Sequence, residues 1–160
     1  MENFLIKETL EDLDAESKYL VHKAKEAASH AYAPYSKFLV GTAVLLDDGT
    51  VVTGTNQENA AYPSGMCAER VALYTCAAIH PGQRIIKMAL TAKRKGVKDV
   101  LSATPCGACR QVILEFETRQ EKPIEIIMLS NEKQWVKAPS AESLLPFSFI
   151  KKNVEHGEKK

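Results

Sequence analysis

The sequence predicts a single-domain α/β protein, a three-layer α/β/α sandwich built on a mixed sheet of about five strands. The chain of 160 residues has the length of one domain that can bury a sizeable core. Apolar runs of strand type alternate with helical patterns after an initial hairpin, which favours helices on both faces of a mixed sheet. No linker or internal repeat interrupts this order, so we expect one domain over residues 1–150 and a frayed polar tail over 151–160.

The first half of the chain should supply one helix and one hairpin. Apolar residues recur at helical spacing over residues 10–31, and Pro34 ends this amphipathic helix. Residues 38–46 are apolar on both alternating faces, which indicates a strand that is covered on both sides. The Asp-Asp-Gly-Thr run at 47–50 is a hairpin turn signal, so residues 51–55 should form the partner strand.

The second half of the chain alternates helices and strands. The predicted elements are a buried helix over 67–79, a strand over 85–91, a helix over 106–120, a buried strand over 124–129, a short edge strand over 134–137 and a last short helix that begins at Ser140 and ends at Pro146. On the second of these helices, the helical period assigns three residues to each face, namely Val112, Ile113 and Phe116 inward and Arg110, Glu117 and Arg119 outward. The starts of both helices should meet at one edge of the sheet.

Composition is that of an ordinary globular protein, with a formal net charge of +1, 26% charged residues and 45% hydrophobic residues. This balance gives no electrostatic footprint for nucleic acid, and we interpret the basic run Ala92–Asp99 as a solvent-facing loop. The amino terminus lacks the apolar core of a secretion signal, and the longest uncharged run, between Arg70 and Arg84, is too short to span a bilayer. We therefore expect a cytoplasmic protein with no nucleic-acid and no membrane partner.

The cysteines carry the strongest chemical signal. Cys106 and Cys109 are three residues apart at a helix start, which is a common half-site for zinc. Cys67, at the start of the other helix, can supply a third sulfur. Cys76 lies on that same helix about 13 Å further along and about 180° around, so we expect a small buried apolar residue there. Three protein ligands leave a fourth position open, as in catalytic rather than structural zinc sites.

Glu69 lies two residues after Cys67, in the first turn of the same helix. Its carboxyl is near enough to exchange protons with a zinc-bound water without being a ligand, which is the position of a general acid and base. A glutamate can also occupy a first helical turn only because the helix dipole favours it there. The combination of Cys67-Ala-Glu69 with Pro105-Cys-x-x-Cys109 favours the catalytic interpretation.

These motifs resemble those of the zinc-dependent nucleoside and nucleobase deaminase superfamily, whose signature joins a His/Cys-x-Glu element to a Pro-Cys-x-x-Cys element. Within it, the chain is most similar to the small, three-cysteine, homotetrameric cytidine deaminases. Four blocks spread over most of residues 25–150 carry this likeness, namely Ala31-Tyr-Ala-Pro-Tyr-Ser-Lys-Phe38-x-Val-Gly41, Asn56-x-Glu58-Asn-Ala-Ala-Tyr62, Cys106-Gly-Ala-Cys-Arg-Gln111 and Leu144-Leu-Pro146. The resemblance implies a cytidine deaminase-like catalytic domain over residues 1–150, with one Zn²⁺ per subunit in a homotetramer.

The resemblance also assigns residues to the substrate. The matching residues of the family hydrogen-bond the ribose, pack beside the sugar and base, and offer a backbone N–H to the base; here they are Asn56 with Glu58, Phe38, and Ala68. Because a buried carboxylate binds hydroxyls and repels phosphate, Glu58 favours a free nucleoside over a nucleotide or a strand. On its own, Asn-x-Glu is a weak signal that also fits a turn or an edge strand.

Two further residues are assigned through the resemblance. Three thiolates on Zn²⁺ leave a net charge of −1, and Arg70 matches an arginine that contacts the ligand sulfurs and offsets this charge; an exposed helix arginine is the alternative. Phe149 resembles the C-terminal aromatic that stacks on a base across the subunit interface, with ordinary core or interface packing as the alternative. Phe147-Ser148 stands where the family pattern has Gly-Ala, which leaves the path of the tail open.

The sequence therefore predicts zinc-dependent hydrolytic deamination of cytidine and deoxycytidine, as in pyrimidine salvage, with no organic cofactor. Two other functions stay open. The first is deamination of a related amino-nucleoside or of cytosine within a polynucleotide. The second is a noncatalytic zinc module for protein interaction, which would need neither an open coordination position nor Glu69.

Overall fold

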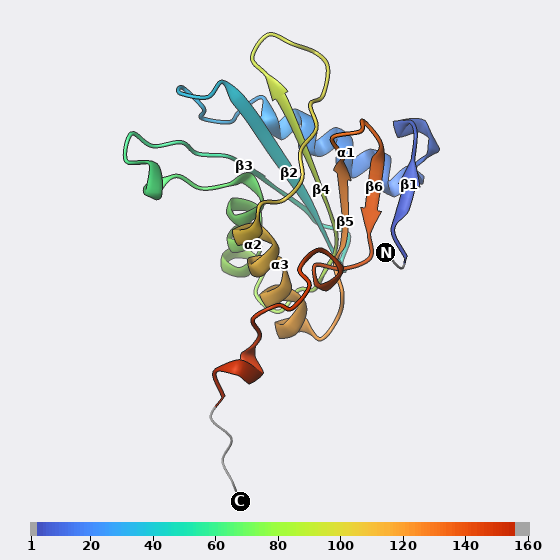
Figure 1. The fold of residues 1–160 in the computed structure, drawn as a ribbon, viewed down its shortest axis with the longest axis vertical. Coiled ribbons are helices and arrows are strands. Elements are labelled where there is room, and N and C mark those ends of the chain that lie inside the picture. Colours follow the sequence, from blue (N-terminus) through green and yellow to red (C-terminus); the bar gives the residue numbers. More distant parts are fainter. Residues whose placement is uncertain (1–2, 156–160) are drawn as a thin grey trace, which may run out of the picture.

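The computed structural model describes residues 3–155 as one mixed sheet of six strands with three α-helices (Figure 1). The strand order is β1-β6-β5-β4-β2-β3, in which β4 and β5 are parallel and the other neighbours are antiparallel. The strands are β1 (Leu5–Lys7), β2 (Phe38–Leu46), β3 (Val51–Thr55), β4 (Ile85–Arg94), β5 (Glu125–Leu129) and β6 (Trp135–Ala138). The helices are α1 (Ala15–Ala28), α2 (Ala68–Ile79) and α3 (Gly107–Gln120).

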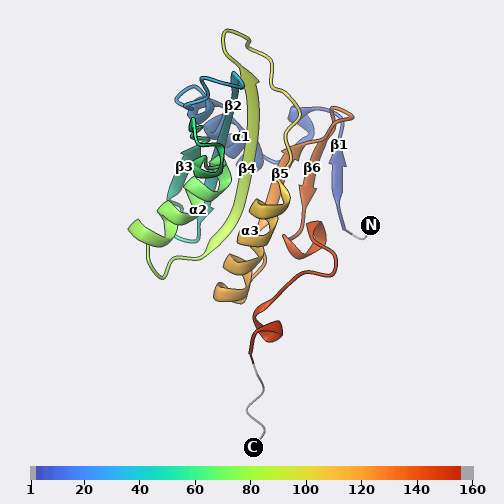
Figure 2. The same ribbon diagram turned by 60° about the vertical axis from the view of Figure 1, so that its left-hand side comes forward.

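The helices form the two outer layers, with α1 on one face of the sheet and α2 and α3 on the other (Figure 2). Two hydrophobic clusters follow this division. One packs α1 against the sheet around Leu20 and Ala24, and the other packs α2 and α3 around Leu73 and Ile113. The predicted three-layer α/β/α sandwich is confirmed, with one strand more than expected.

The additional strand is β1, which pairs with β6 at one edge of the sheet. Its three residues are too few to show an alternating pattern in the sequence. β6 is predicted from the sequence as an edge strand over 134–137, and this placement is wrong. The strand spans Trp135–Ala138 and lies inside the sheet, because β1 covers its outer side.

α1 is shorter at both ends than the helix predicted over 10–31. It begins after Asp14, whose carboxylate accepts the backbone N–H of Ser17 at 3.0 Å and so caps the first turn. A separate 3-10 turn precedes it. The helix ends at Ala28 rather than at Pro34, because the chain beyond it pairs with the segment that follows β3.

β2 and β3 form the predicted hairpin, with Gly49 in the left-handed region at a φ of +86°. β4 runs to Arg94, beyond its predicted end, and stays paired with β2 up to the Phe38–Arg94 pair. The basic run Ala92–Asp99 therefore begins as strand and continues as a loop. All of residues 94–99 are exposed, as the sequence predicts.

α2 lies directly against β3 because Gly54 has no side chain. A Cβ atom at this position would stand 2.5 Å from the backbone N of Ala72 and 2.6 Å from the backbone O of Ala68, so a larger residue would force the helix away. The outer face of α2 is open, with Tyr74 48% and Ile79 66% exposed. The predicted burial of the whole helix is therefore wrong on this side, because the helix belongs to an outer layer of the single chain.

α3 departs from its predicted orientation at Glu117. The helical period predicts an outward side chain, but Glu117 is buried, and its Oε1 accepts the backbone N–H groups of Ile124 and Ala141, each at 2.8 Å. Backbone donors replace water around this carboxylate, although burial still raises its pKa. The contacts tie the end of α3 to the start of β5 and to the segment after β6.

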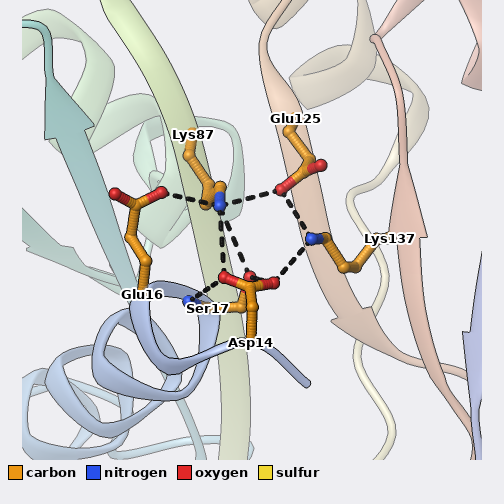
Figure 3. A network of polar contacts seen from close by, with 6 residues as sticks. All are labelled: Asp14, Glu16, Ser17, Lys87, Glu125 and Lys137. Carbon is orange, nitrogen blue, oxygen red and sulfur yellow. Dashed lines mark hydrogen bonds and ion pairs between the residues drawn. The ribbon is translucent and has the colours of Figure 1, made fainter. Parts of the chain in front are cut away.

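The α1 face of the sheet holds a cluster of five charged side chains (Figure 3). Lys87 of β4 contacts carboxylate oxygens at 3.6, 2.7 and 3.1 Å, from Asp14, Glu16 and Glu125 respectively. Lys137 of β6 contacts Asp14 at 2.7 Å and Glu125 at 3.1 Å. Each charge has an opposite charge as partner, so the cluster joins the start of α1 to β4, β5 and β6.

The carboxyl-terminal segment contains two 3-10 turns, Glu142–Leu144 and Lys151–Asn153. The first stands within the short helix predicted between Ser140 and Pro146. The second turn lies at the start of the tail that is predicted to be frayed. Residues 156–160 of this tail lie outside the described residues. Among residues 3–155, each helix is too short or too polar to cross a lipid bilayer.

Candidate active site

The starts of α2 and α3 bring three cysteine side chains together. Cys67 and Cys106 are the N-cap residues of the two helices, and Cys109 lies in the first turn of α3. The Sγ atoms of Cys67 and Cys106 are 4.0 Å apart, those of Cys106 and Cys109 are 3.5 Å apart, and all three lie within 4.8 Å of one another. Sulfurs around one tetrahedral zinc, each at about 2.3 Å from the ion, are about 3.8 Å apart. This donor set fits zinc.

Arg70 places positive charge next to the sulfurs. Its Nη2 donates to Cys67 Sγ at 3.4 Å, so Arg70 is a half-buried contact of the site rather than an exposed helix arginine. Hydrogen bonds from Cys109 and Arg70 lower the pKa of Cys67 to about 5, which makes this sulfur a thiolate at neutral pH. The hydrogen bond with Cys67 in turn raises the pKa of Cys109.

Cys76 lies apart from this group. It is buried in the core beneath α2, and its sulfur is not among those that converge. Burial raises the pKa of this thiol to about 11. The structure confirms the prediction of a small buried residue.

Glu69 occupies the first turn of α2 and lines the same cleft as Cys67 and Cys106. It is only 4% exposed. Burial, with a smaller contribution from the charge of Cys67, raises the pKa of this carboxyl to about 7. None of the ion pairs found within residues 3–155 includes Glu69. A carboxyl that titrates near neutral pH can both take up and release a proton under physiological conditions.

A cleft of about 1020 Å³ opens at these helix starts. Its walls come from the start of β2, the segment after β3, the start of α2 and the segment that leads into α3. Val40, Met66 and Leu90 supply apolar surface, and the polar side chains concentrate near the sulfurs and after β3. Such a cleft is large enough for a small molecule and combines apolar walls with a few placed polar groups.

Phe38, Asn56 and Ala68 line this cleft. The amide of Asn56 contacts the backbone of β2, because its Oδ1 accepts the N–H of Val40 at 2.8 Å and its Nδ2 donates to the Phe38 carbonyl at 2.9 Å. One Nδ2 hydrogen is left for another partner. Ala68 is the first residue of α2, where the N–H has no intrahelical acceptor.

Glu58 forms a wall of the cleft through contacts with the loop before β2. Its carboxylate accepts the N–H of Tyr35 at 2.9 Å, the N–H of Ser36 at 3.3 Å and the Ser36 hydroxyl. The hydrogen bond from the hydroxyl is the main reason why the pKa of Glu58 lies below its ordinary value. Glu58 is half-buried rather than buried as the sequence argument assumes, because the loop covers only one side of it.

One protein family, described as the cytidine and deoxycytidylate deaminase zinc-binding region, matches residues 14–122 of the chain. The chain belongs to this family. The cytidine deaminase of Sporosarcina psychrophila is 40% identical over 138 residues, which cover 86% of this chain and 93% of the relative. The cytidine deaminase of Halalkalibacterium halodurans is 37% identical over 136 residues, which cover 84% of this chain and 95% of the relative.

Solved structures of cytidine deaminases share the fold. The protein from Burkholderia pseudomallei matches with a TM-score of 0.69 at 36% identity, over 86% of this chain and 100% of that chain. The protein from Mycobacterium tuberculosis matches with a TM-score of 0.66 at 36% identity, over 86% of this chain and 99% of that chain. In this deaminase family member, three converging sulfurs match the zinc-binding region that the family is named for, and zinc is its cofactor.

Phe149, the remaining predicted site residue, does not line the cleft of its own chain. Its side chain is 61% exposed, and its carbonyl accepts Gln111 Nε2 at 2.8 Å. Phe147 is fully exposed and has a φ of +55°, in the left-handed region. The structure therefore brings together the cysteines, Glu69, Arg70 and the cleft residues, but not Phe149.

Sequence reasoning missed several residues of this deaminase cleft. Tyr35 and Ser36 hold Glu58, and Met66 and Asn131 add lining. Tyr35 and Ser36 stand inside the Ala-Pro-Tyr-Ser block that carries the family likeness, so the motif itself was a usable signal. Asn131 follows β5 in a turn, where asparagine is common for conformational reasons alone, so nothing in the sequence marks it.

Proposed function

We propose that this protein catalyses the zinc-dependent hydrolytic deamination of cytidine and deoxycytidine to uridine and deoxyuridine, with release of ammonia. The observation that carries the proposal is the buried carboxyl of Glu69 beside three converging cysteine sulfurs in one cleft. A noncatalytic zinc module has no need for a buried carboxyl of raised pKa at its metal donors. The named activity of the relatives supports the same conclusion.

Cys67, Cys106 and Cys109 hold the zinc, which supplies the Lewis acid that lets water lose a proton near neutral pH. Glu69 accepts this proton and passes it to N3 of the cytosine ring while the water oxygen bonds to C4. Glu69 then delivers the second proton of the water to the 4-amino group, the C4–N4 bond breaks, and ammonia leaves. Arg70 offsets the negative charge of the sulfurs.

The residues after β3 and at the start of β2 select the nucleoside. The free Nδ2 hydrogen of Asn56 and the ionised carboxylate of Glu58 suit the ribose hydroxyls. Phe38 offers an aromatic surface to the sugar and base, and the N–H of Ala68 is available to a ring oxygen. The negative charge of Glu58 disfavours a phosphate at the same place, which supports free nucleosides as substrates rather than nucleotides or nucleic acid.

The active form in this proposal is a cytoplasmic homotetramer with no membrane or nucleic-acid partner. The open apolar residues on the outer face of α2, Tyr74 and Ile79, support contacts between copies. Phe149 would stack on the base in a neighbouring copy, because its exposed ring lies outside its own cleft. Thiolate zinc ligands stay reduced in the cytoplasm.

One ultraviolet assay tests the proposal. Zinc-loaded protein is mixed with cytidine, deoxycytidine, cytidine monophosphate or free cytosine, and the loss of absorbance and the release of ammonia are followed. We expect turnover with the first two compounds only. No product from any of the four compounds would favour the noncatalytic zinc module, and turnover confined to cytidine monophosphate or cytosine would assign the protein to that substrate.

A further inference from the structure

Two neighbouring side chains of α3 hold the carboxyl-terminal segment 144–149. The guanidinium of Arg110 donates to the Pro105 carbonyl at 2.8 Å through Nε and to the Leu144 carbonyl at 3.0 Å through Nη1. The amide of Gln111 donates to the Phe149 carbonyl at 2.8 Å. The segment is therefore fixed at both of its ends to the first turns of α3.

The same stretch of α3 carries a zinc ligand. Cys109, Arg110 and Gln111 are consecutive, and each makes a different contact, with the other sulfurs, with Leu144 and with Phe149 respectively. Because a helix turn is rigid, the place of Phe149 is set relative to the metal donors of its own chain. The backbone of Phe149 is thus attached to the helix turn that carries Cys109.

We propose that Gln111 and Arg110 are positioning residues, which hold the segment 144–149 so that Phe149 completes the cleft of a second copy of this chain. This proposal rests on the proposed function. Gln111 touches neither the substrate nor the zinc in this account, and it acts through the backbone of Phe149. Its contribution therefore concerns substrate binding in the neighbouring copy and not the chemical step.

Exposed apolar side chains on the segment and on α2 favour a second copy of the chain as the occupant of this surface. Phe149 is exposed on the segment, and Tyr74 and Ile79 are exposed on the outer face of α2. An isolated subunit that leaves these three large apolar side chains open has surface suited to self-association. Phe149 does not line the cleft of its own chain, so the cleft that its ring would complete is that of another copy.

The backbone at Phe147 supports a fixed path for the segment. The left-handed region is unfavourable for a non-glycine residue, and such a conformation persists only where the surrounding contacts hold it. The contacts on either side are those of Arg110 to Leu144 and of Gln111 to Phe149. The turn at Phe147 therefore belongs to the arrangement that presents Phe149.

The test compares Gln111→Glu, which keeps the side-chain shape but removes the N–H donor, with the unaltered zinc-loaded protein. We expect the KM for cytidine to rise about tenfold while kcat changes less than about twofold, since one hydrogen bond is lost and the reacting groups are untouched. Phe149→Ala should raise KM by at least as much. In the double variant Gln111→Glu with Phe149→Ala, KM should equal that of Phe149→Ala alone, because Gln111 acts through Phe149.

Three control variants separate positioning from general stability. Gln120→Ala, at the other end of α3, removes hydrogen bonds to Ile85 of 2.7 and 2.9 Å and should lower thermal stability without changing KM. Gln111→Lys keeps an N–H donor, so its KM for cytidine should lie much closer to that of the unaltered protein than the KM of Gln111→Glu does. Phe147→Gly keeps the left-handed turn and should leave KM unchanged.

The outcomes separate this proposal from the proposed function. If the unaltered protein deaminates cytidine but Gln111→Glu leaves KM unchanged, or if the two changes add fully in the double variant, the positioning role is overturned and the deaminase function stands. A rise in KM with Phe147→Gly would overturn the assignment to Phe149. If the unaltered protein produces no uridine, the proposed function itself fails.

Discussion

Partly buried charged side chains form ion pairs on the α1 face of the sheet, whereas the buried carboxyl on the cleft face forms none within residues 3–155. On the α1 face, Lys87 and Lys137 are each 12% exposed at the side chain, and both contact carboxylates of Asp14 and Glu125 (Figure 3). On the cleft face, Glu69 is buried, and no ion pair among the described residues includes it. The α1 face thus holds charges that pair with one another, whereas the cleft holds a buried carboxyl that forms no ion pair among the described residues.

The difference appears in the pKa values. Partial burial opposes ionisation of Asp14, but hydrogen bonds from Lys137 and Ser17 and the charge of Lys87 outweigh it, and the pKa falls. Burial dominates at Glu69, where a backbone hydrogen bond, a hydrogen bond with Cys109 and the charge of Arg70 offset it only in part, and its pKa rises to about 7. Paired charges stabilise the fold and stay ionised, and an unpaired buried carboxyl is prepared for proton transfer. Each of the following changes tests one side of this contrast.

The largest effect should come from Glu69→Gln. This change keeps the shape of the side chain and removes the group that carries protons, so turnover of cytidine should fall by about 10³-fold or more, with zinc content unchanged. Turnover by the absorbance assay and zinc by elemental analysis provide the measurements. Glu117→Gln is the matched control. Glu117 is a second buried glutamate, and its carboxylate accepts the backbone N–H groups of Ile124 and Ala141. A Glu69 variant with a tenth of the normal turnover would refute the assigned role.

Next in size should be the effect of Cys109→Ser, which removes a zinc donor. Bound zinc should fall well below one ion per chain and deaminase activity should fall with it, because two thiolates hold the ion much more weakly than three. Elemental analysis after dialysis against a weak chelator measures the loss. Cys76→Ser should keep zinc and activity while lowering the melting temperature, since it leaves a hydroxyl in an apolar core. Equal zinc content in the two variants would contradict the three-sulfur site.

On the α1 face, Lys87→Met should affect stability and not catalysis. The change leaves three carboxylates without one of their cations, but Asp14 and Glu16 are about half exposed and can regain water. We therefore expect a loss of about 1–2 kcal/mol in the free energy of unfolding, less than for a fully buried pair. Urea denaturation followed by fluorescence measures it, and kcat/KM for cytidine should stay within about twofold. A large loss of activity at unchanged stability would mean that the two faces are coupled.

The smallest expected effect concerns pH and Asp14. Its pKa in the folded protein lies below the ordinary value of 3.8, so its interactions stabilise the fold fully at pH values above 3.8 and lose this contribution as the pH falls further. The stability difference between the unaltered protein and Asp14→Asn should therefore be constant near neutral pH and shrink below about pH 4. Urea titrations at several pH values give the difference. A difference that grows as the pH falls would have the wrong sign.

The candidate site was the part of the molecule most open to prediction from the sequence. Cys67, Glu69, Cys106 and Cys109 stand at fixed short spacings at helix starts, and such local patterns report their own geometry. The layers of the fold were equally accessible, because apolar periodicity distinguishes strands from helices. Arg70 followed from its place next to Glu69 and from the family likeness.

What escaped prediction depends on contacts between distant parts of the chain. Glu117 has the sequence context of an exposed helix residue, and only the approach of Ile124 and Ala141 makes its burial favourable. Likewise, the partial exposure of Glu58 depends on how the loop before β2, which contains Tyr35, packs against it. Neither arrangement leaves a periodic trace in the sequence. The ends of α1 were misjudged for the same reason, since a cap and a distant pairing decide them.

The short strand β1 has a consequence that does not concern the chemistry. It covers the outer backbone of β6, pairing Leu5 with Lys137 and Lys7 with Trp135. The family match begins only at Asp14, so a chain trimmed to the common region would lose this strand. The hydrogen-bonding groups of β6 would then face solvent as a template for strands of other molecules. We therefore expect a chain that begins at Asp14 to aggregate more readily than the full chain, whatever its catalytic activity.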